Sequence, residues 1–215
     1  MVINNNDSKK ICDILTDNCL VEKFKLSNFY NKEDTYSDMI NFLSNEGLII
    51  KIANNGLDKT SVVNGPGIRY TIFTQGCDHK CPGCHNPETH NYYNGNYVYI
   101  FDLINDINKY KNIIRGITLT GGDPLFLRNF NSTIKLCKLI KEELNKEIWI
   151  YTGYEWNEII NSDLKKITNW CDVIVTGRFV SSLQSYNLKY YGSSNQKLID
   201  VKESLKNNSQ TELKI

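Results

Sequence analysis

Three cysteines lie close together between Gln75 and Thr89, in the stretch QGCDHKCPGCHNPET. They have the spacing C-x3-C-x2-C and are Cys77, Cys81 and Cys84. Glycine accepts unusual φ angles and proline is already bent, so the chain can turn tightly around a compact inorganic group at Gly76, Pro82 and Gly83. Because thiolates bind metals, the spacing indicates a site for a metal ion or a metal cluster.

Parts of this loop also match other kinds of site. The segment from Cys81 to His85 has the haem-attachment pattern C-x-x-C-H, and its two cysteines alone match a dithiol redox pair, but neither pattern uses Cys77. A structural zinc site needs a fourth ligand, which one of three histidines could provide: His79, His85 or His90. Iron–sulfur clusters usually take four thiolates, so a triplet with no fourth cysteine nearby leaves one iron open to a substrate or cofactor.

Composition narrows the class of protein. The chain has 215 residues, which suits one domain with an extension, and a net charge of +1 with only four arginines. We therefore expect no direct binding to nucleic acid. The sequence has no apolar run of the roughly 20 residues that span a membrane, and its start lacks the apolar part of a signal peptide. A cytoplasmic location is expected, where seven cysteines favour metal or thiol chemistry over disulfides.

Residues 1–47 differ in pattern from the rest of the chain. Two groups of apolar residues have helical spacing there: Ile11, Ile14 and Leu15, and then Tyr36, Met39, Ile40 and Leu43. These groups predict a short helical N-terminal extension. We expect a core at 48–205 to follow it, and then a polar C-terminal tail at 206–215. Cys12 and Cys19 lie seven residues apart, which is not a common ligand spacing, and are interpreted as ordinary thiols.

From Leu48 onward, strand patterns alternate with helix patterns. The predicted strands are 48–53, 68–74, 117–120, 148–152, 173–176 and 198–201, and the predicted helices are 101–110, 132–144 and 155–160. Phe101, Ile104 and Ile107 share one face of the first of these helices, and Cys137 is interpreted as a core residue of the second. The alternation predicts an α/β fold of βα units around a parallel sheet, either open or barrel-like.

Four of the predicted strands end in turns rich in glycine or polar residues. These are the cysteine loop, Gly121-Gly122-Asp123, Thr152-Gly153-Tyr154 and Gly177-Arg178. In barrels built from βα units, the chemistry lies at the carboxyl ends of the strands. We therefore expect the four turns to lie together at one rim.

The chain resembles the radical S-adenosylmethionine (SAM) superfamily and, within it, the activating proteins of anaerobic (class III) ribonucleoside-triphosphate reductases. The resemblance runs from about Leu48 to Val201. It rests on six blocks in order: VVNGPGIR (62–69), TQGCDHKCPGCHNPET (74–89), TLTGGDPL (118–125), IWIYTGY (148–154), DVIVTGRFV (172–180) and YGSSNQ (191–196).

The resemblance implies a partial (β/α) barrel and a set of site residues. Cys77, Cys81 and Cys84 would bind three irons of a [4Fe-4S] cluster, and SAM would chelate the fourth iron. The turn formed by Gly121, Gly122 and Asp123 would lie close to the SAM amino group. A second group would lie along the adenine of SAM: Gly83, Cys84 and His85. Gly83 stands where many members of the superfamily have an aromatic residue, and glycine at this position points to the activating-protein subgroup.

The resemblance also implies a reaction. A reduced cluster, supplied by an external low-potential electron donor, would cleave SAM, and the resulting radical would take a hydrogen atom from a glycine of the anaerobic ribonucleoside-triphosphate reductase. Because a complete barrel needs about 250 residues, the shorter stretch here should leave an open side for a protein partner. The alternatives are action on another glycyl radical enzyme or on a small molecule, or a zinc-binding module. The sequence shows no His–Asp pair that demands acid–base chemistry.

Overall fold

The computed structural model describes residues 2–3 and 35–214. The strands are β1 (Val2–Ile3), β2 (Ile49–Ser61), β3 (Arg69–Thr74), β4 (Asn96–Tyr99), β5 (Gly116–Gly121), β6 (Glu147–Tyr151), β7 (Val173–Thr176) and β8 (Lys197–Asp200). The helices are α3 (Thr35–Asn45), α4 (Ile100–Lys109), α5 (Leu127–Leu139), α6 (Trp156–Ile160) and α7 (Val201–Asn207), with short turns of 3-10 or π-helix at Pro87–Thr89, Ile140–Leu144, Asp163–Asn169 and Ser181–Leu183. The helix predicted around Ile11, Ile14 and Leu15 lies outside the described residues, as do Cys12 and Cys19.

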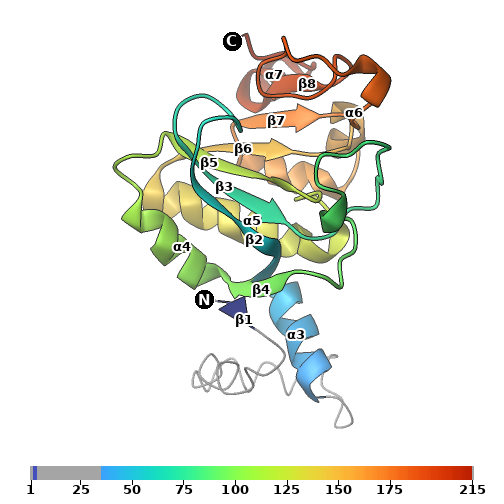
Figure 1. Cartoon of the computed structure of the whole chain (residues 1–215). Helices are drawn as coiled ribbons and strands as arrows, with labels where there is room; N and C mark the ends of the chain where they lie inside the picture. The colour runs from blue at the N-terminus through green and yellow to red at the C-terminus, as the bar shows by residue number, and fades with distance from the viewer. Residues whose placement is uncertain (1, 4–34, 215) are drawn as a thin grey trace.

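Within the described part of the chain, eight strands form one sheet in the order β1-β4-β2-β3-β5-β6-β7-β8 (Figure 1). The neighbours β3, β5, β6 and β7 run parallel to one another. The α/β class is therefore confirmed, and so is the parallel arrangement of the central strands.

The expectation of parallel strands is wrong for the outer part of the sheet. β2 is antiparallel to β3 and to β4, and β8 is antiparallel to β7. A short turn around Gly65 joins β2 to β3, and the segment between β7 and β8 has only the 3-10 turn Ser181–Leu183. Parallel neighbours need a longer crossover, usually a helix, so both connections give antiparallel pairs.

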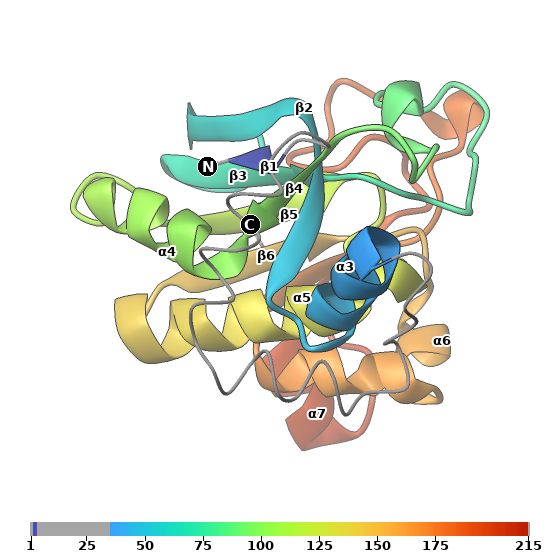
Figure 2. The ribbon, with the colours of Figure 1, turned by 90° about the horizontal axis from the view of Figure 1, so that it is seen from below.

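Helices cover one face of this sheet (Figure 2). Most residues of the central strands are buried, and alternate residues along them belong to the core cluster that includes residues of α4 and α5: Ile72, Leu119, Ile150 and Ile174. The face of α4 differs from the prediction. Ile100, Leu103, Ile104 and Ile107 are buried, whereas Phe101 is 37% exposed and lies against the ring of Tyr99, because the helix begins at Ile100 and turns its buried stripe away from Phe101.

The helix α3 packs onto the sheet through a second apolar cluster. Its buried residues Met39, Ile40, Phe42 and Leu43 meet Ile49 of β2. This confirms the second helix predicted before residue 48. At the other end of the chain, Leu213 N donates to Leu198 O at 2.8 Å, so the polar tail pairs with β8. The division at residues 47 and 205 stays a prediction. Among the described helices, none has the length and apolar content to cross a membrane.

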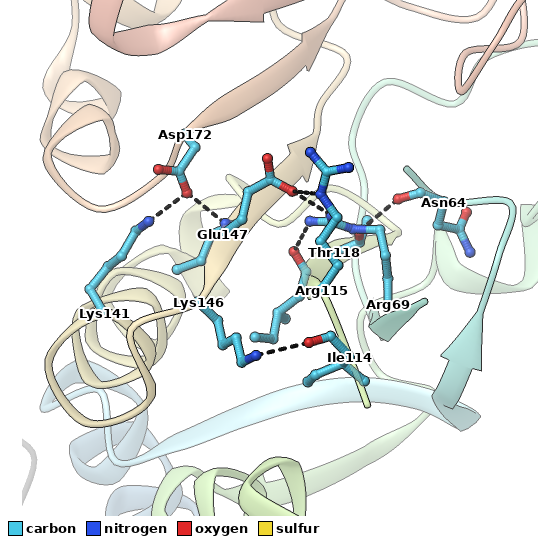
Figure 3. A network of polar contacts seen from close by, with 11 residues as sticks. Asn64, Arg69, Ile114, Arg115, Thr118, Lys141, Lys146, Glu147 and Asp172 are labelled. Atoms are coloured by element: carbon cyan, nitrogen blue, oxygen red, sulfur yellow. Dashed lines mark hydrogen bonds and ion pairs between the residues drawn. The ribbon is translucent and has the colours of Figure 1, made fainter. Parts of the chain in front are cut away.

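A polar network ties the amino ends of the parallel strands together (Figure 3). Arg69, at the start of β3, is fully buried. Its guanidinium donates to Thr118 Oγ1 at 2.6 Å, to Ile117 O at 2.8 Å and to Glu147 Oε2 at 2.7 Å. The Arg69 guanidinium also lies 5.2 Å from the ring centre of Trp149. A buried charge is tolerated when it is paired and hydrogen-bonded, so this one side chain links β3, β5 and β6.

We predict that Arg69→Met destabilises the fold strongly. The change removes three hydrogen bonds and leaves Glu147 without its buried partner, which should lower the free energy of unfolding by about 3 kcal/mol. The control is Arg115→Met. The side chain of Arg115 is 58% exposed, and its Nε lies 3.6 Å from the same Glu147 oxygen, which is a longer and more exposed contact than that of Arg69. This exposed pair should contribute less than about 1 kcal/mol. Anaerobic denaturant unfolding measures both values, and equal losses would contradict the prediction.

Candidate functional site

The four predicted turns meet at one rim of the sheet. In the register of β3 and β5, Thr74 stands opposite Gly121, so the cysteine loop and the glycine turn leave the sheet side by side. A cavity of about 210 Å³ lies there, and residues from the ends of β3, β5, β6 and β7 line it, including Cys77, Cys81, Cys84, Gly121, Gly122, Asp123, Thr152, Gly153, Gly177 and Arg178. The expectation that these turns lie together is confirmed.

The three cysteines are free thiols and are partly exposed at this cavity. Burial raises the pKa of Cys77 to about 11, and the charge of Asp123 adds to the effect, while the backbone N–H groups of His79 and Lys80 act against it. Burial also raises the pKa of Cys84, whose sulfur accepts a hydrogen bond from Asn86 N at 3.4 Å. Metals bind thiolates, so a group held here must displace the protons of these thiols.

Close contacts at the rim explain why positions 76 and 122 are glycine. A Cβ atom at Gly122 would lie 2.5 Å from Gly76 O, and Gly122 N donates to Thr74 O at 2.8 Å. A Cβ atom at Gly76 would lie 2.7 Å from the ring of Phe126, and Gly76 has a φ of +108°. The turn after β5 and the cysteine loop can approach this closely only because both positions lack a side chain.

Asp123 is the most buried of the charged residues at the cavity, with 1% of its surface exposed. Its Oδ1 accepts from Leu125 N at 2.8 Å, and its Oδ2 accepts from Thr152 Oγ1 at 2.8 Å and Gly153 N at 3.0 Å. The same Oδ2 lies 2.7 Å from His79 Nε2. The structure thus forms a His–Asp pair, which the sequence analysis did not anticipate.

Gly83 and His85 face a different wall of the site. The ring of His85 lies 4.8 Å from that of Phe179, and a Cβ at Gly83 would lie 3.6 Å from the same phenyl ring. Phe179 follows β7, and its ring packs closely against the backbone of Gly192, where a Cβ atom would lie 3.1 Å from the ring. Phe179 was missed as a site residue, although it belongs to the block DVIVTGRFV.

The block YGSSNQ closes this wall by hydrogen bonds. Gln196 Oε1 accepts from Gly192 N at 3.0 Å and Ser193 N at 3.1 Å, while Gln196 Nε2 donates to Gly177 O at 3.0 Å. One amide side chain therefore ties the loop before β8 to the turn after β7. The block could be identified in the sequence, but the role of Gln196 could not, because its partners lie up to 19 residues away.

The donor set at the cavity suits an iron–sulfur cluster. Three partly exposed thiols come from one loop, and four strand ends surround them. Among the described residues, no group of three or more His, Cys, Asp or Glu side chains is arranged to hold a single metal ion. A larger cavity of about 680 Å³ in the described part of the chain, between α3 and the start of α5, is lined by none of the three cysteines.

Comparison with known proteins agrees with this chemistry. The family model described as "4Fe-4S single cluster domain" matches residues 63–199. The chain is also similar to curated proteins named anaerobic ribonucleoside-triphosphate reductase-activating protein. The relative from Escherichia coli K12 is 40% identical over 139 residues, covering 63% of this chain and 90% of the relative.

Two further relatives with the same name come from a bacteriophage and from another bacterium. The protein of Enterobacteria phage T4 is 37% identical over 139 residues, covering 63% of this chain and 86% of its own length. The protein of Haemophilus influenzae is 33% identical over 144 residues, covering 64% of this chain and 90% of its own length. The chain therefore belongs to the 4Fe-4S single cluster domain family and, within it, to the family of anaerobic ribonucleoside-triphosphate reductase-activating proteins.

Proposed function

We propose that this protein is an activating enzyme that cleaves SAM reductively at a [4Fe-4S] cluster and generates a glycyl radical on an anaerobic ribonucleoside-triphosphate reductase. The observation that carries the proposal is the meeting of the three loop cysteines with the ends of four strands in one cavity. Family membership supports the iron–sulfur cluster and names the reductase as the protein that the relatives activate.

In this proposal, Cys77, Cys81 and Cys84 bind three irons of the cluster. SAM completes the site, between the turn Gly121-Gly122-Asp123 on one side and Gly83, Cys84 and His85 on the other. When bound, the two cofactors supply the one-electron chemistry that removes a hydrogen atom from a glycine Cα of the partner. An external low-potential donor provides the electron.

The residues of this chain position and shield the reaction rather than exchange protons. Phe73, Thr120 and Tyr151 project from the central strands into the cavity wall, on the sheet face opposite α4 and α5. We propose that this face is the inside of a partial (β/α) barrel of the radical SAM type. Among these side chains, Tyr151 is held by a neighbour, since its Oη donates to Tyr190 O at 2.6 Å.

The position of the cysteine loop supports a protein substrate. Cys81 and Cys84 are partly exposed, and His85 is exposed, so the loop lies at the surface of the molecule. A reactive radical must be kept from water while it takes its hydrogen atom. We infer that the reductase covers this rim and brings its glycine to it.

We predict that Cys77→Ser, Cys81→Ser and Cys84→Ser each lose the cluster after anaerobic reconstitution, because each would remove one of the three ligands. The matched controls are the buried cysteines Cys137 and Cys171. Cys137→Ala and Cys171→Ala should keep the iron and sulfide content of the wild type, although Cys137→Ala should cost about 1–2 kcal/mol of stability. Iron and acid-labile sulfide assays give the answer, and a loop variant that retains full iron content would refute the ligand assignment.

We further predict that this protein, incubated anaerobically with the reductase, SAM and a reductant, produces a doublet radical signal on the reductase. Electron paramagnetic resonance detects the radical, and deuterium at the glycine Cα should alter the splitting. The expected co-product is 5′-deoxyadenosine. Turnover on a free small molecule with no signal on the reductase would instead favour a metabolite substrate, and a colourless protein with bound zinc would refute the proposed chemistry altogether.

A further inference from the structure

Three separate segments of the chain meet at the carboxylate of Asp123. Leu125 N belongs to the turn after β5, Thr152 Oγ1 and Gly153 N belong to the turn after β6, and His79 Nε2 belongs to the cysteine loop. A carboxylate only accepts hydrogen bonds, so the contact with His79 is a hydrogen bond when His79 carries its proton on Nε2. With four donors, the carboxylate has little remaining capacity for another partner.

The ring of His79 is fixed on its other sides as well. Its side chain is 6% exposed. The ring lies edge-on to Tyr154, with 4.6 Å between the ring centres, and a Cβ at Gly153 would lie 2.4 Å from its Cδ2 atom. Gly153 must therefore be glycine for the ring to occupy this place. The hydrogen bond and the packing together select one position for a ring that belongs to the loop between two of the cysteines.

Fixing His79 also fixes the backbone beside Cys77. His79 lies midway between Cys77 and Cys81 in the loop, so its fixed ring also restrains the two backbone segments that carry these cysteines. Lys80 has a φ of +48°, which is uncommon for a residue with a side chain and persists only where the surroundings determine it. The anchor at His79 lies directly before this bend.

We propose that His79 and Asp123 form a positioning pair that anchors the cysteine loop to the ends of β5 and β6 and so sets the orientation of Cys77 and Cys81, which lie on either side of His79. The inference rests on the proposed function, because it concerns the cluster that Cys77 would help to hold. The surroundings of the ligand sulfurs are among the factors that set the reduction potential of a cluster. Partners behind the ligands set their orientation in the same way.

This assignment differs from the one that the resemblance implies for Asp123. A contact with the SAM amino group needs a free oxygen lone pair at the cavity, whereas Asp123 Oδ2, which faces the cysteine loop, already accepts from three donors and Oδ1 accepts from Leu125 N. The glycines of the same turn do not share this constraint. The geometry points to Asp123 as a residue that acts through His79.

The pair is tested with two substitutions that separate the ring from its hydrogen bond. His79→Phe keeps a ring between Gly153 and Tyr154 but cannot donate, whereas His79→Gln keeps an N–H donor at nearly the same distance along the side chain. Asp78→Asn is the matched control, since Asp78 is the exposed neighbour in the same loop. The measurements on reconstituted protein are iron content, the midpoint potential from an anaerobic redox titration without SAM, and SAM affinity.

We expect His79→Phe to shift the midpoint potential and to lower iron retention, because the cysteine loop loses its anchor, and His79→Gln to restore both toward the wild type. Asp78→Asn should match the wild type. Asp123→Asn should shift the potential in the same direction as His79→Phe, and the double variant should add little, because residues that act through one contact are not additive.

Three outcomes would overturn the positioning pair. They are an unchanged potential and iron content in His79→Phe, an equal loss in His79→Phe and His79→Gln, and an Asp123→Asn variant that loses SAM affinity while its potential stays that of the wild type. In each case a wild-type protein with an intact cluster leaves the proposed function standing. A wild-type protein that binds no cluster would refute the proposed function itself.

Discussion

The parallel register of β3, β5, β6 and β7 is the constraint on which the site depends. Once Thr74 stands opposite Gly121, and Leu119 opposite Ile150, the strands end at one level and their turns must share one space. The cysteine loop then lies against the turn after β5, at a distance that only Gly76 and Gly122 allow. A shift of register between β3 and β5 would separate Cys77 from Asp123 without changing a single side chain.

Buried polar groups lie at both ends of these strands, and they have different structural roles at the two ends. At the amino ends, Arg69 links three strands through its guanidinium and has no access to a ligand, since it is fully buried. At the carboxyl ends, Asp123 links a strand turn to the loop that carries the cysteines. The first group stabilises the sheet, and the second connects the sheet to the site.

The central part of the fold could be predicted from the sequence because it depends on local patterns. Strands such as IRYTIFT and IWIY are apolar and β-branched, and the glycine turns that follow them mark where they end. The outer strands could not be predicted with the same success. Asn96–Tyr99 is a strand of four residues after a polar stretch, and its place in the sheet depends on pairing with β1 and β2. The direction of β8 depends on a loop without a helix.

At the site, residue spacing identified the cysteines as candidate ligands, but it did not reveal the contacts that hold their loop in place. His79 lies within the motif, and Asp123 lies 44 residues away, so no local pattern joins them. Phe179 and Gln196 likewise depend on packing between distant loops. Motifs of this kind reveal which residues meet a cofactor, whereas the residues that position them become visible only when the chain is folded.

The thiols of this chain differ in how easily dissolved oxidants reach them. Cys137 and Cys171 are buried in the core, while the three loop cysteines are the partly exposed thiols among the described residues. Oxidation of sulfur follows exposure and thiolate character, and it proceeds through sulfenic acid to irreversible products. Exposure to air should therefore modify the loop sulfurs first and leave a folded but inactive protein, so a well-folded sample prepared in air is no indication that its cluster site is intact.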